Sequence, residues 1–251
     1  MLYKDLLSGL STLPGNLSVW LEDVSSGQTV CHRPDEDHIA ASVIKLGVLL
    51  TAFEAFETGA LDPGQLYSVK PEDKVPSCGA LTYLHDGLMV THADLAVLMI
   101  ILSDNTATNI LADILGIGYV NGVLERYGLS GMCLRRKMFD GEAAARGLEN
   151  TVTARACAVF FRRLLKGELV SPDASRKMLS ILSDQRLNGK IPFYLHGQGI
   201  RVAHKTGEDD GVSHDAGVIF SDRPVIVVFL GNDTDVPAFE RYMQDTARLL
   251  V

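Results

Sequence analysis

Apolar positions divide this 251-residue chain into a strand-forming start, a helical middle and a strand-forming end. Residues 2–12 carry apolar side chains at helical spacing. The β-prone runs 17–24 and 28–31 follow, and the turn Ser25-Ser26-Gly27 between them predicts a hairpin. We therefore expect the chain to begin with a helix and two paired strands.

From Ser42 to about Ser183 the apolar residues recur every three or four positions, which is typical of amphipathic helices. The helices that this pattern predicts are 43–56, 93–102, 106–115, 119–127, 152–165 and 172–182. The least regular stretch, 135–150, contains two glycines and an alanine-rich segment. We expect it to form a long surface loop.

Strand signals return near the end of the chain, and a helical pattern closes it. The predicted strands are 196–205, 214–220 and 224–230, followed by a helix over 238–251. Because strands at both ends have to pair, we expect an α+β fold with an antiparallel sheet formed from both termini.

The two expected lobes follow from this sheet pairing. Residues 1–36 and 190–251 are predicted to form an α/β lobe, and residues 37–189 an inserted all-α lobe. A cleft between two such lobes is a usual place for an active site.

The composition narrows the partners and the compartment. A net charge of −8 and an isoelectric point near 5.3 argue against nucleic acid or an anionic membrane surface as a partner. No apolar run reaches the length of about 18 residues that a membrane helix needs, and residues 1–5 do not begin an export signal. We therefore expect a soluble, cytoplasmic protein.

Cysteine and histidine positions give little support for a metal or cofactor. The four cysteines lack C-x-x-C spacing and mostly neighbour apolar residues, which favours buried reduced thiols. His204, His214 and Asp215 are the only histidines and carboxylate that we expect to approach one another on neighbouring strands, and they form no compact ligand motif. The other histidines are expected in loops or at the surface. We predict no metal and no cofactor.

Three short motifs stand in a fixed order: Ser42-Val43-Ile44-Lys45, Ser103-Asp104-Asn105 and Lys205-Thr206-Gly207. A chain of this size contains on the order of one S-x-x-K by chance, but well under ~0.1 copies of SDN or KTG. Their joint occurrence points to acyl transfer by a serine nucleophile.

The first motif suits a nucleophile and its base. Ser42 precedes an apolar helical run, so its oxygen lies near helix N–H groups that favour negative charge. Lys45 is three residues on, on the same helical face, where we expect its amine to reach the hydroxyl of Ser42 and to act as a base once it is desolvated. The alternative is a helix-capping serine beside a solvated lysine.

The other two motifs suit proton transfer and substrate binding. In the functional interpretation Ser103 relays a proton to the leaving group and Asn105 orients substrate, whereas a structural interpretation makes SDN a helix cap. The third motif supplies a cation, a hydroxyl and a glycine that permits close approach of substrate backbone. The backbone amides of Ser42 and Glu208 are the expected oxyanion hole.

The order S-x-x-K, SDN, KTG resembles the signature set of class A serine β-lactamases and penicillin-binding proteins over nearly the whole chain. The resemblance implies that Ser42 is acylated, that Lys45 is its base partner and that Ser103 is the proton relay. The substrate contacts that it implies are Asn105, Lys205, Thr206, Gly207 and Glu208. The expected partner is a small-molecule acyl substrate, a β-lactam or another amide or ester.

The chain departs from this family where deacylation is concerned. Class A β-lactamases carry a glutamate in an E-x-x-L-N segment, and no such segment occurs here. The segment Asp184 to Asn188 imitates its spacing but lies beyond the following helices, so we expect it to be unrelated. In the corresponding region, residues 134–150, the candidate water activators are Asp140, Glu142 and Glu149. We therefore predict acylation of Ser42 with weak turnover of β-lactams at best.

A second departure is the acidic run Glu208-Asp209-Asp210 directly after KTG, which is expected to repel anionic substrates. Three other functions stay open. The first is a covalent penicillin-binding or sensor module without efficient deacylation. The second is a cell-wall transpeptidase or carboxypeptidase, and the third is a catalytically dead scaffold. The sequence leaves the oligomeric state undecided.

Overall fold

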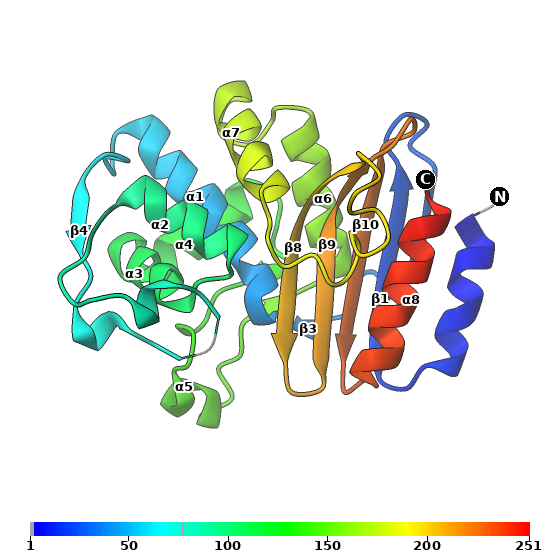
Figure 1. Ribbon diagram of the computed structural model, residues 1–251, viewed down its shortest axis with the longest axis horizontal. Coiled ribbons are helices and arrows are strands. Elements are labelled where there is room, and N and C mark those ends of the chain that lie inside the picture. Colours follow the sequence, from blue (N-terminus) through cyan, green and yellow to red (C-terminus); the bar gives the residue numbers. More distant parts are fainter. Residues whose placement is uncertain (1–2, 77) are drawn as a thin grey trace.

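The structure, a computed structural model, describes residues 3–76 and 78–251. Its centre is a five-stranded antiparallel sheet in the order β2-β1-β10-β9-β8, in which the first strands pair with the last (Figure 1). The strands are β1 (Asn16–Asp23), β2 (Thr29–His32), β8 (Arg201–Asp209), β9 (Val212–Phe220) and β10 (Val225–Asn232). This pairing confirms the expected sheet formed from both termini and the α+β class.

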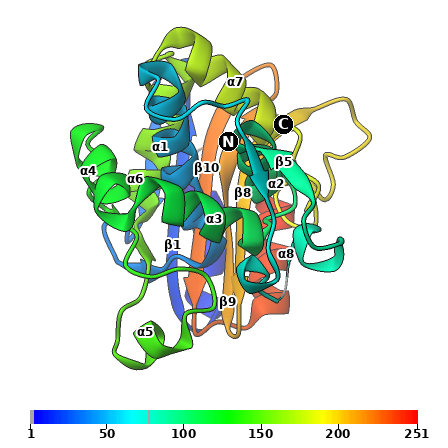
Figure 2. The ribbon, with the colours of Figure 1, turned by 90° about the vertical axis from the view of Figure 1, so that its left-hand side faces the viewer.

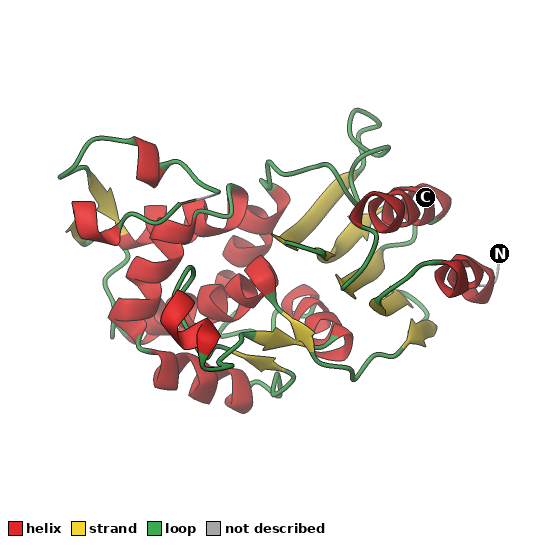
Figure 3. Cartoon of the chain, turned by 90° about the horizontal axis from the view of Figure 1, so that it is seen from below, coloured by secondary structure: helices red, strands yellow, loops and turns green. Residues whose placement is uncertain are grey.

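The two faces of the sheet bury alternate residues of the same strands, as the two-residue period of a strand requires. On one face Val227 and Phe229 of β10 pack against α8 (Val236–Leu249) and the 3₁₀ helix η1 (Tyr3–Thr12). On the other face Ile226 and Val228 join the core of the helical part. Figure 3 shows α8 and η1 on one side of the sheet and the helical part on the other.

The helical part surrounds α1 (Lys45–Thr58), whose side chains are nearly all buried (Figure 2). The helices around it are α2 (His92–Ile101), α3 (Asn105–Leu115), α4 (Ile117–Arg126), α6 (Ala154–Leu165) and α7 (Pro172–Ser183). Helix α6 packs on the central strands, so one core runs from the helices to the sheet. The division at residues 36/37 and 189/190 into two lobes stays a prediction.

Short elements complete the chain. In one small sheet β7 (Thr151–Val152) pairs with β3 (His38–Ile39) on one side and with β6 (Met132–Cys133) on the other. In another, β4 (Leu66–Ser68) pairs with β5 (Met89–Thr91). The other short helices are η2 (Ala41–Ile44), η3 (Pro71–Asp73), η4 (Leu81–Tyr83) and α5 (Gly141–Ala145). Helix α5 lies within the segment that was expected to be a plain loop, and Asp140 caps it by accepting a hydrogen bond from Ala143 N–H.

The structure confirms the predicted hairpin and the six middle helices within a few residues at their ends. Leu2, the first residue of the expected opening helix, lies outside the described residues. The strand expected from residue 196 begins only at Arg201, because residues 192–199 form turns with Gly197 and Gly199 at positive φ. The helix predicted from Val43 begins as the 3₁₀ turn η2.

The prediction that the cysteines are buried is wrong for two of them. Only Cys157 is buried, whereas Cys31 and Cys78 are exposed and Cys133 is half-buried. Two histidines expected at the surface, His38 and His92, are also buried. Among the described helices, none alone is long and apolar enough to cross a membrane; α3 and α4 reach that length only as a pair bent by 84°.

Candidate active site

All three sequence motifs border one cavity of about 560 Å³. Ser42, Ser103, Asn105 and Thr206 contribute to its wall. These residues come from η2, from the junction of α2 and α3, and from β8. The fold therefore collects in one place polar residues that are far apart in the sequence.

Ser42 lies in the first turn of η2 and is half-buried at the cavity wall. The N–H groups of a first helical turn have no partner within the helix, so they are free to bind an oxyanion. The next two residues, Val43 and Ile44, are completely buried and hold this turn against the core. Ala41, directly before the serine, has a φ of 42°, a strained conformation for a residue with a side chain.

Lys45 is the first residue of α1, and its side chain is completely buried. Its Nζ donates to Ser103 O at 2.7 Å, to Ser103 Oγ at 3.0 Å and to Asn105 Oδ1 at 2.7 Å. Burial holds the pKa of Lys45 well below its usual value, and the charge of Lys205 lowers this pKa further. A lysine whose pKa is lowered in this way gives up its proton more readily than a free lysine and is suited to act as a base.

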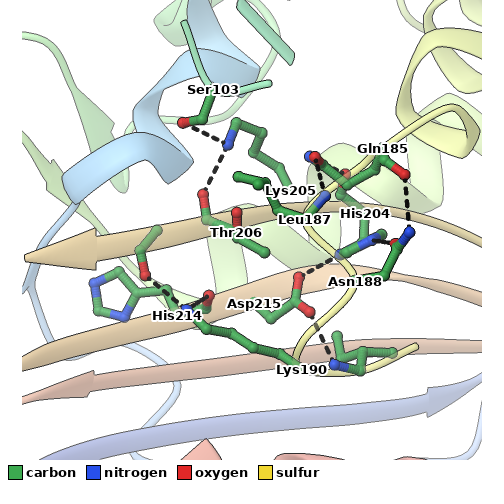
Figure 4. A network of polar contacts seen from close by, with 12 residues as sticks. Ser103, Gln185, Leu187, Asn188, Lys190, His204, Lys205, Thr206, His214 and Asp215 are labelled. Atoms are coloured by element: carbon green, nitrogen blue, oxygen red, sulfur yellow. Dashed lines mark hydrogen bonds and ion pairs between the residues drawn. The ribbon is translucent and has the colours of Figure 1, made fainter. Parts of the chain in front are cut away.

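Ser103 connects the two buried lysines. Its Oγ accepts from Lys45 Nζ at 3.0 Å. It also accepts from Lys205 Nζ at 3.1 Å (Figure 4). The residue has a φ of 54°, which turns the chain sharply between α2 and α3. A hydroxyl that contacts two amines and borders the cavity is suited to passing a proton between them and a substrate.

Asp104 has a structural position beside Ser103. Its Oδ1 accepts from Ala107 N–H and so caps α3, and its Oδ2 accepts from the N–H groups of Ala80 and Leu81. The capping interpretation of SDN is therefore correct for Asp104. Ser103 and Asn105, in contrast, both line the cavity.

Lys205 and Thr206 lie near the end of β8 and are almost completely buried. Burial lowers the pKa of Lys205 to about 7, so its cationic and neutral forms coexist at neutral pH. Its Nζ also donates to Thr206 O at 2.9 Å. This amine lies next to the cavity, where a substrate carboxylate or amide can approach it.

Gly207 permits a close approach between β8 and η2. A Cβ at this position would lie 3.1 Å from Val43 Cγ2 and 3.3 Å from Ala40 O. The strand that carries KTG therefore runs directly beside the turn that carries Ser42. This proximity is what the expected oxyanion hole, the amides of Ser42 and Glu208, requires.

The three candidate water activators lie in different surroundings. Glu142 is exposed and is not part of the cavity wall, whereas Asp140 and Glu149 line it. Glu149 Oε2 accepts from Arg136 Nε at 3.1 Å and from its Nη2 at 2.7 Å. Asp140 uses one oxygen to cap α5 and makes no ion pair within the described chain.

Asn150, a residue that the sequence did not single out, closes this loop at its base. Its Oδ1 accepts from the N–H groups of Arg135 and Arg136, and its Nδ2 donates to Arg136 O. The N–H group of Ala40, directly before η2, donates to Asn150 O at 2.8 Å. The loop is therefore tied directly to the segment before Ser42.

Two other expectations meet a different geometry. Lys45 was expected to reach the Ser42 hydroxyl, but its hydrogen bonds go to Ser103 and Asn105. The segment Asp184 to Asn188, which imitates the missing E-x-x-L-N spacing, does approach the site, because Leu187 lines the cavity.

His204, His214 and Asp215 do not form a metal site. His204 Nδ1 lies 2.8 Å from Asp215 Oδ1, and its Nε2 lies 3.1 Å from Asn188 Oδ1. His214 instead contacts Ile39 O. Within the described residues, no group of three or more His, Cys, Asp or Glu side chains is placed to hold a metal ion.

Lys190 is a second residue that the sequence analysis missed. Its side chain is buried, and its Nζ donates to Gly207 O at 3.3 Å and to His214 O at 3.4 Å (Figure 4). It also pairs with Glu208 at 2.9 Å. A lone lysine in a turn-rich segment gave no sequence signal of this contact.

A model of the beta-lactamase enzyme family matches residues 2–251. Among curated proteins, beta-lactamase FAR-1 from Nocardia farcinica is 28% identical over 236 residues, covering 88% of this chain and 72% of its own. The solved structure of a beta-lactamase from Sphaerobacter thermophilus is 32% identical, with a TM-score of 0.90 and coverage of 99% and 95%. The structure of PBP-A is 25% identical, with a TM-score of 0.89 and coverage of 99% and 94%.

A mutant of PBP-A has been solved as an acyl-enzyme complex with penicillin G. It is 25% identical to this chain, with a TM-score of 0.88 and coverage of 99% of this chain and 94% of the mutant.

Proposed function

Because this chain belongs to the beta-lactamase enzyme family, we propose that it is a serine hydrolase that forms an acyl-enzyme on Ser42 with a β-lactam, amide or ester. The observation that carries the proposal is the position of Ser42 in one cavity with Ser103, Asn105 and Thr206. The completely buried amine of Lys45 supplies a base next to this group. No cofactor enters the proposal.

In the acylation step the Ser42 oxygen attacks the carbonyl carbon of the substrate. The serine proton passes to the neutral amine of Lys45, directly or through a hydroxyl such as that of Ser103. The carbonyl oxygen gains negative charge, which the N–H groups of Ser42 and Glu208 stabilise. Ser103 then donates a proton to the leaving nitrogen or oxygen, and the bond from the carbonyl carbon to that atom breaks.

The residues at the end of β8, together with Asn105, are proposed to orient the substrate. Lys205 in its cationic form, with the hydroxyl of Thr206, binds a carboxylate or carbonyl oxygen of the substrate. Asn105 Oδ1 is occupied by Lys45, so its Nδ2 is the group left to donate to the substrate. Gly207 lets the substrate backbone lie against β8.

Deacylation is proposed to be slow. A water molecule has to attack the ester carbonyl of the acyl-enzyme, and it needs a base on the loop of residues 134–150. Of the three candidates, Asp140 fits best because it lines the cavity without a cationic partner. One oxygen of Asp140 already caps α5, so only its other oxygen remains to act as a base. For this reason we expect water activation to be slow.

The alternative function is a covalent penicillin-binding module that stays acylated. The structural likeness to PBP-A favours it, because one PBP-A structure is an acyl-enzyme with penicillin G. The absence of an E-x-x-L-N segment from the sequence points the same way.

Intact-mass spectrometry with burst kinetics tests both functions. The protein is mixed with benzylpenicillin and with a panel of activated amides and esters, and Ser42→Ala is the control. A mass adduct that is absent from Ser42→Ala supports acylation; no adduct with any probe, or an adduct that survives in Ser42→Ala, contradicts it. A steady state after the burst identifies a hydrolase, and a stop at one equivalent identifies the covalent binding module.

A further inference from the structure

Both peptide groups of Ile39, three residues before the nucleophile, are held by buried side chains from distant strands. Asn232 Oδ1, at the end of β10, accepts from Ile39 N–H at 3.1 Å. His214 Nε2, in β9, lies 2.7 Å from Ile39 O. Ile39 itself is one of the residues that line the cavity.

The surroundings of His214 define which ring nitrogen carries the proton. Nδ1 lies 3.0 Å from both the Gly231 N–H, which donates to it, and Ser213 O, whereas Nε2 has only Ile39 O, at 2.7 Å. The shorter contact to a carbonyl requires a donor, so Nε2–H donates to Ile39 O and Nδ1 accepts from Gly231 N–H. With the proton on Nδ1 instead, two N–H groups would face each other and Ile39 O would face an unprotonated nitrogen. Burial lowers the pKa of His214 to about 3, so the ring stays neutral at physiological pH.

Asn232 is fixed by two donors. Its Oδ1 accepts from Ile39 N–H and lies 2.8 Å from His38 Nδ1, which carries a proton in this contact. A flipped amide would set Nδ2 against Ile39 N–H. This orientation leaves Asn232 Nδ2 without a hydrogen-bond partner, and it is the one buried side-chain nitrogen or oxygen among the described residues of which this is true.

His214 also contacts the other wall of the expected oxyanion hole. A Cβ on Gly207 would lie 3.1 Å from His214 Cδ2, so the imidazole packs against the residue before Glu208. Lys190 Nζ donates to the carbonyls of Gly207 and His214 and so links the same two strands. One imidazole therefore contacts both the segment that leads to Ser42 and the strand that leads to Glu208.

We propose that His214 and Asn232 are positioning residues that hold Ile39 to Ser42 in register with β8 and thereby set the spacing of the Ser42 and Glu208 amides. The inference rests on the proposed function, in which these two amides bind the oxyanion. The polar bonds of His214, rather than its bulk, set the position of the backbone. Their loss lowers the acylation rate constant more than the binding of the substrate.

The test compares His214→Gln with His214→Leu. Glutamine offers an N–H donor for Ile39 O and an oxygen that accepts from Gly231 N–H, whereas leucine offers only bulk. We expect His214→Leu to lower the acylation rate constant about 10- to 100-fold with little change in the dissociation constant for the substrate. His214→Gln is expected to stay within about threefold of the unaltered protein.

His92→Leu is the matched control, because His92 is also buried and its Nδ1 also contacts a carbonyl, that of Asp62. It should lower the midpoint of thermal unfolding and leave the acylation rate constant unchanged. A folded His214→Leu that acylates at the unaltered rate overturns the proposal. A His214→Gln that is as slow as His214→Leu also overturns it, because restoring the two polar bonds would then not restore the acylation rate.

A second measurement separates this inference from the proposed function. Hydrogen exchange of the peptide that spans residues 37–46 reports the Ile39 amide without any substrate. We expect faster exchange there in His214→Leu and Asn232→Ala than in His214→Gln. If the unaltered protein acylates with no probe, the proposed function fails, and equal exchange in the three variants overturns the positioning role.

Discussion

The amines of Lys45 and Lys205 contact the same oxygen, Ser103 Oγ, at 3.0 and 3.1 Å. Burial disfavours the charge of each amine and lowers the pKa of both lysines, that of Lys205 to about 7. The charge of Lys205 lowers the pKa of Lys45 further. Ser103 therefore lies between two amines that lose their protons more readily than a free lysine.

The base role of Lys45 predicts a large loss when its proton transfer is removed. Lys45→Arg keeps a cation that cannot release its proton, and Lys45→Met removes the amine. We expect both to lower the acylation rate constant about 10²- to 10⁴-fold. Stopped-flow acylation with a chromogenic β-lactam measures it, and Lys177→Met, on the surface of α7, is the control.

The buried state of Lys205 predicts how stability changes with pH. Its pKa is about 7 in the folded protein and 10.5 in the unfolded chain, so the unfolded chain binds more protons between these values. Stability contributed at this site therefore rises with pH from about 7 to 10.5. Between pH 7 and pH 9, urea unfolding should show that the free energy of unfolding increases more for the unaltered protein than for Lys205→Met. Equal changes in both proteins would contradict this prediction.

The acidic run after KTG predicts an effect of substrate charge. Asp209 lines the cavity and makes no ion pair among the described residues, whereas Glu208 is partly neutralised by Lys190. Neutralising both, as Glu208→Gln with Asp209→Asn, should raise the acylation rate by anionic β-lactams about two- to fivefold at low salt. The gain should shrink in 0.5 M salt, a concentration at which the screening length falls to roughly 4 Å.

The design separates the two carboxylates. Asp209→Asn alone should give most of the gain, because it leaves Lys190 paired. Asp222→Asn, in the exposed turn after β9, controls for net charge. Rates that are unchanged at both salt concentrations would remove the role of the acidic run.

The position of Asp140 predicts an effect on turnover alone. Asp140→Asn keeps a side-chain oxygen that can cap α5, since asparagine is as good a cap as aspartate. We expect the deacylation rate constant to fall at least about tenfold, with acylation unchanged. Glu142→Gln is the control, because Glu142 is exposed and lies outside the cavity wall. An equal deacylation rate in both variants would exclude Asp140 as the base.

The order of elements and the motif residues were predictable because each rests on a local signal. The spacing of apolar residues predicted α1 and α6, and β-prone runs bounded by turn residues predicted the strands of the sheet. S-x-x-K, SDN and KTG are short and rare, so they identified residues that the cavity then brings together.

The remaining parts depend on contacts between distant residues. His38 was expected at the surface, yet it is buried because Ser18 and Asn232 supply hydrogen bonds from strands far away in the sequence. The same holds for His214 and Lys190, whose partners are carbonyl groups of other segments. No local pattern marks a side chain that bonds to backbone on another element.

The pairing of β1 with β10 has a consequence for synthesis of the protein. Asn16 pairs with Asn232, so the centre of the sheet closes only after nearly the whole chain has left the ribosome. Lys205 and the amide of Glu208 belong to the same late part. A nascent or prematurely ended chain therefore carries Ser42, Lys45 and Ser103 but lacks Lys205 and the Glu208 amide, so the groups proposed to bind the substrate anion and the oxyanion arrive only with the last part of the fold.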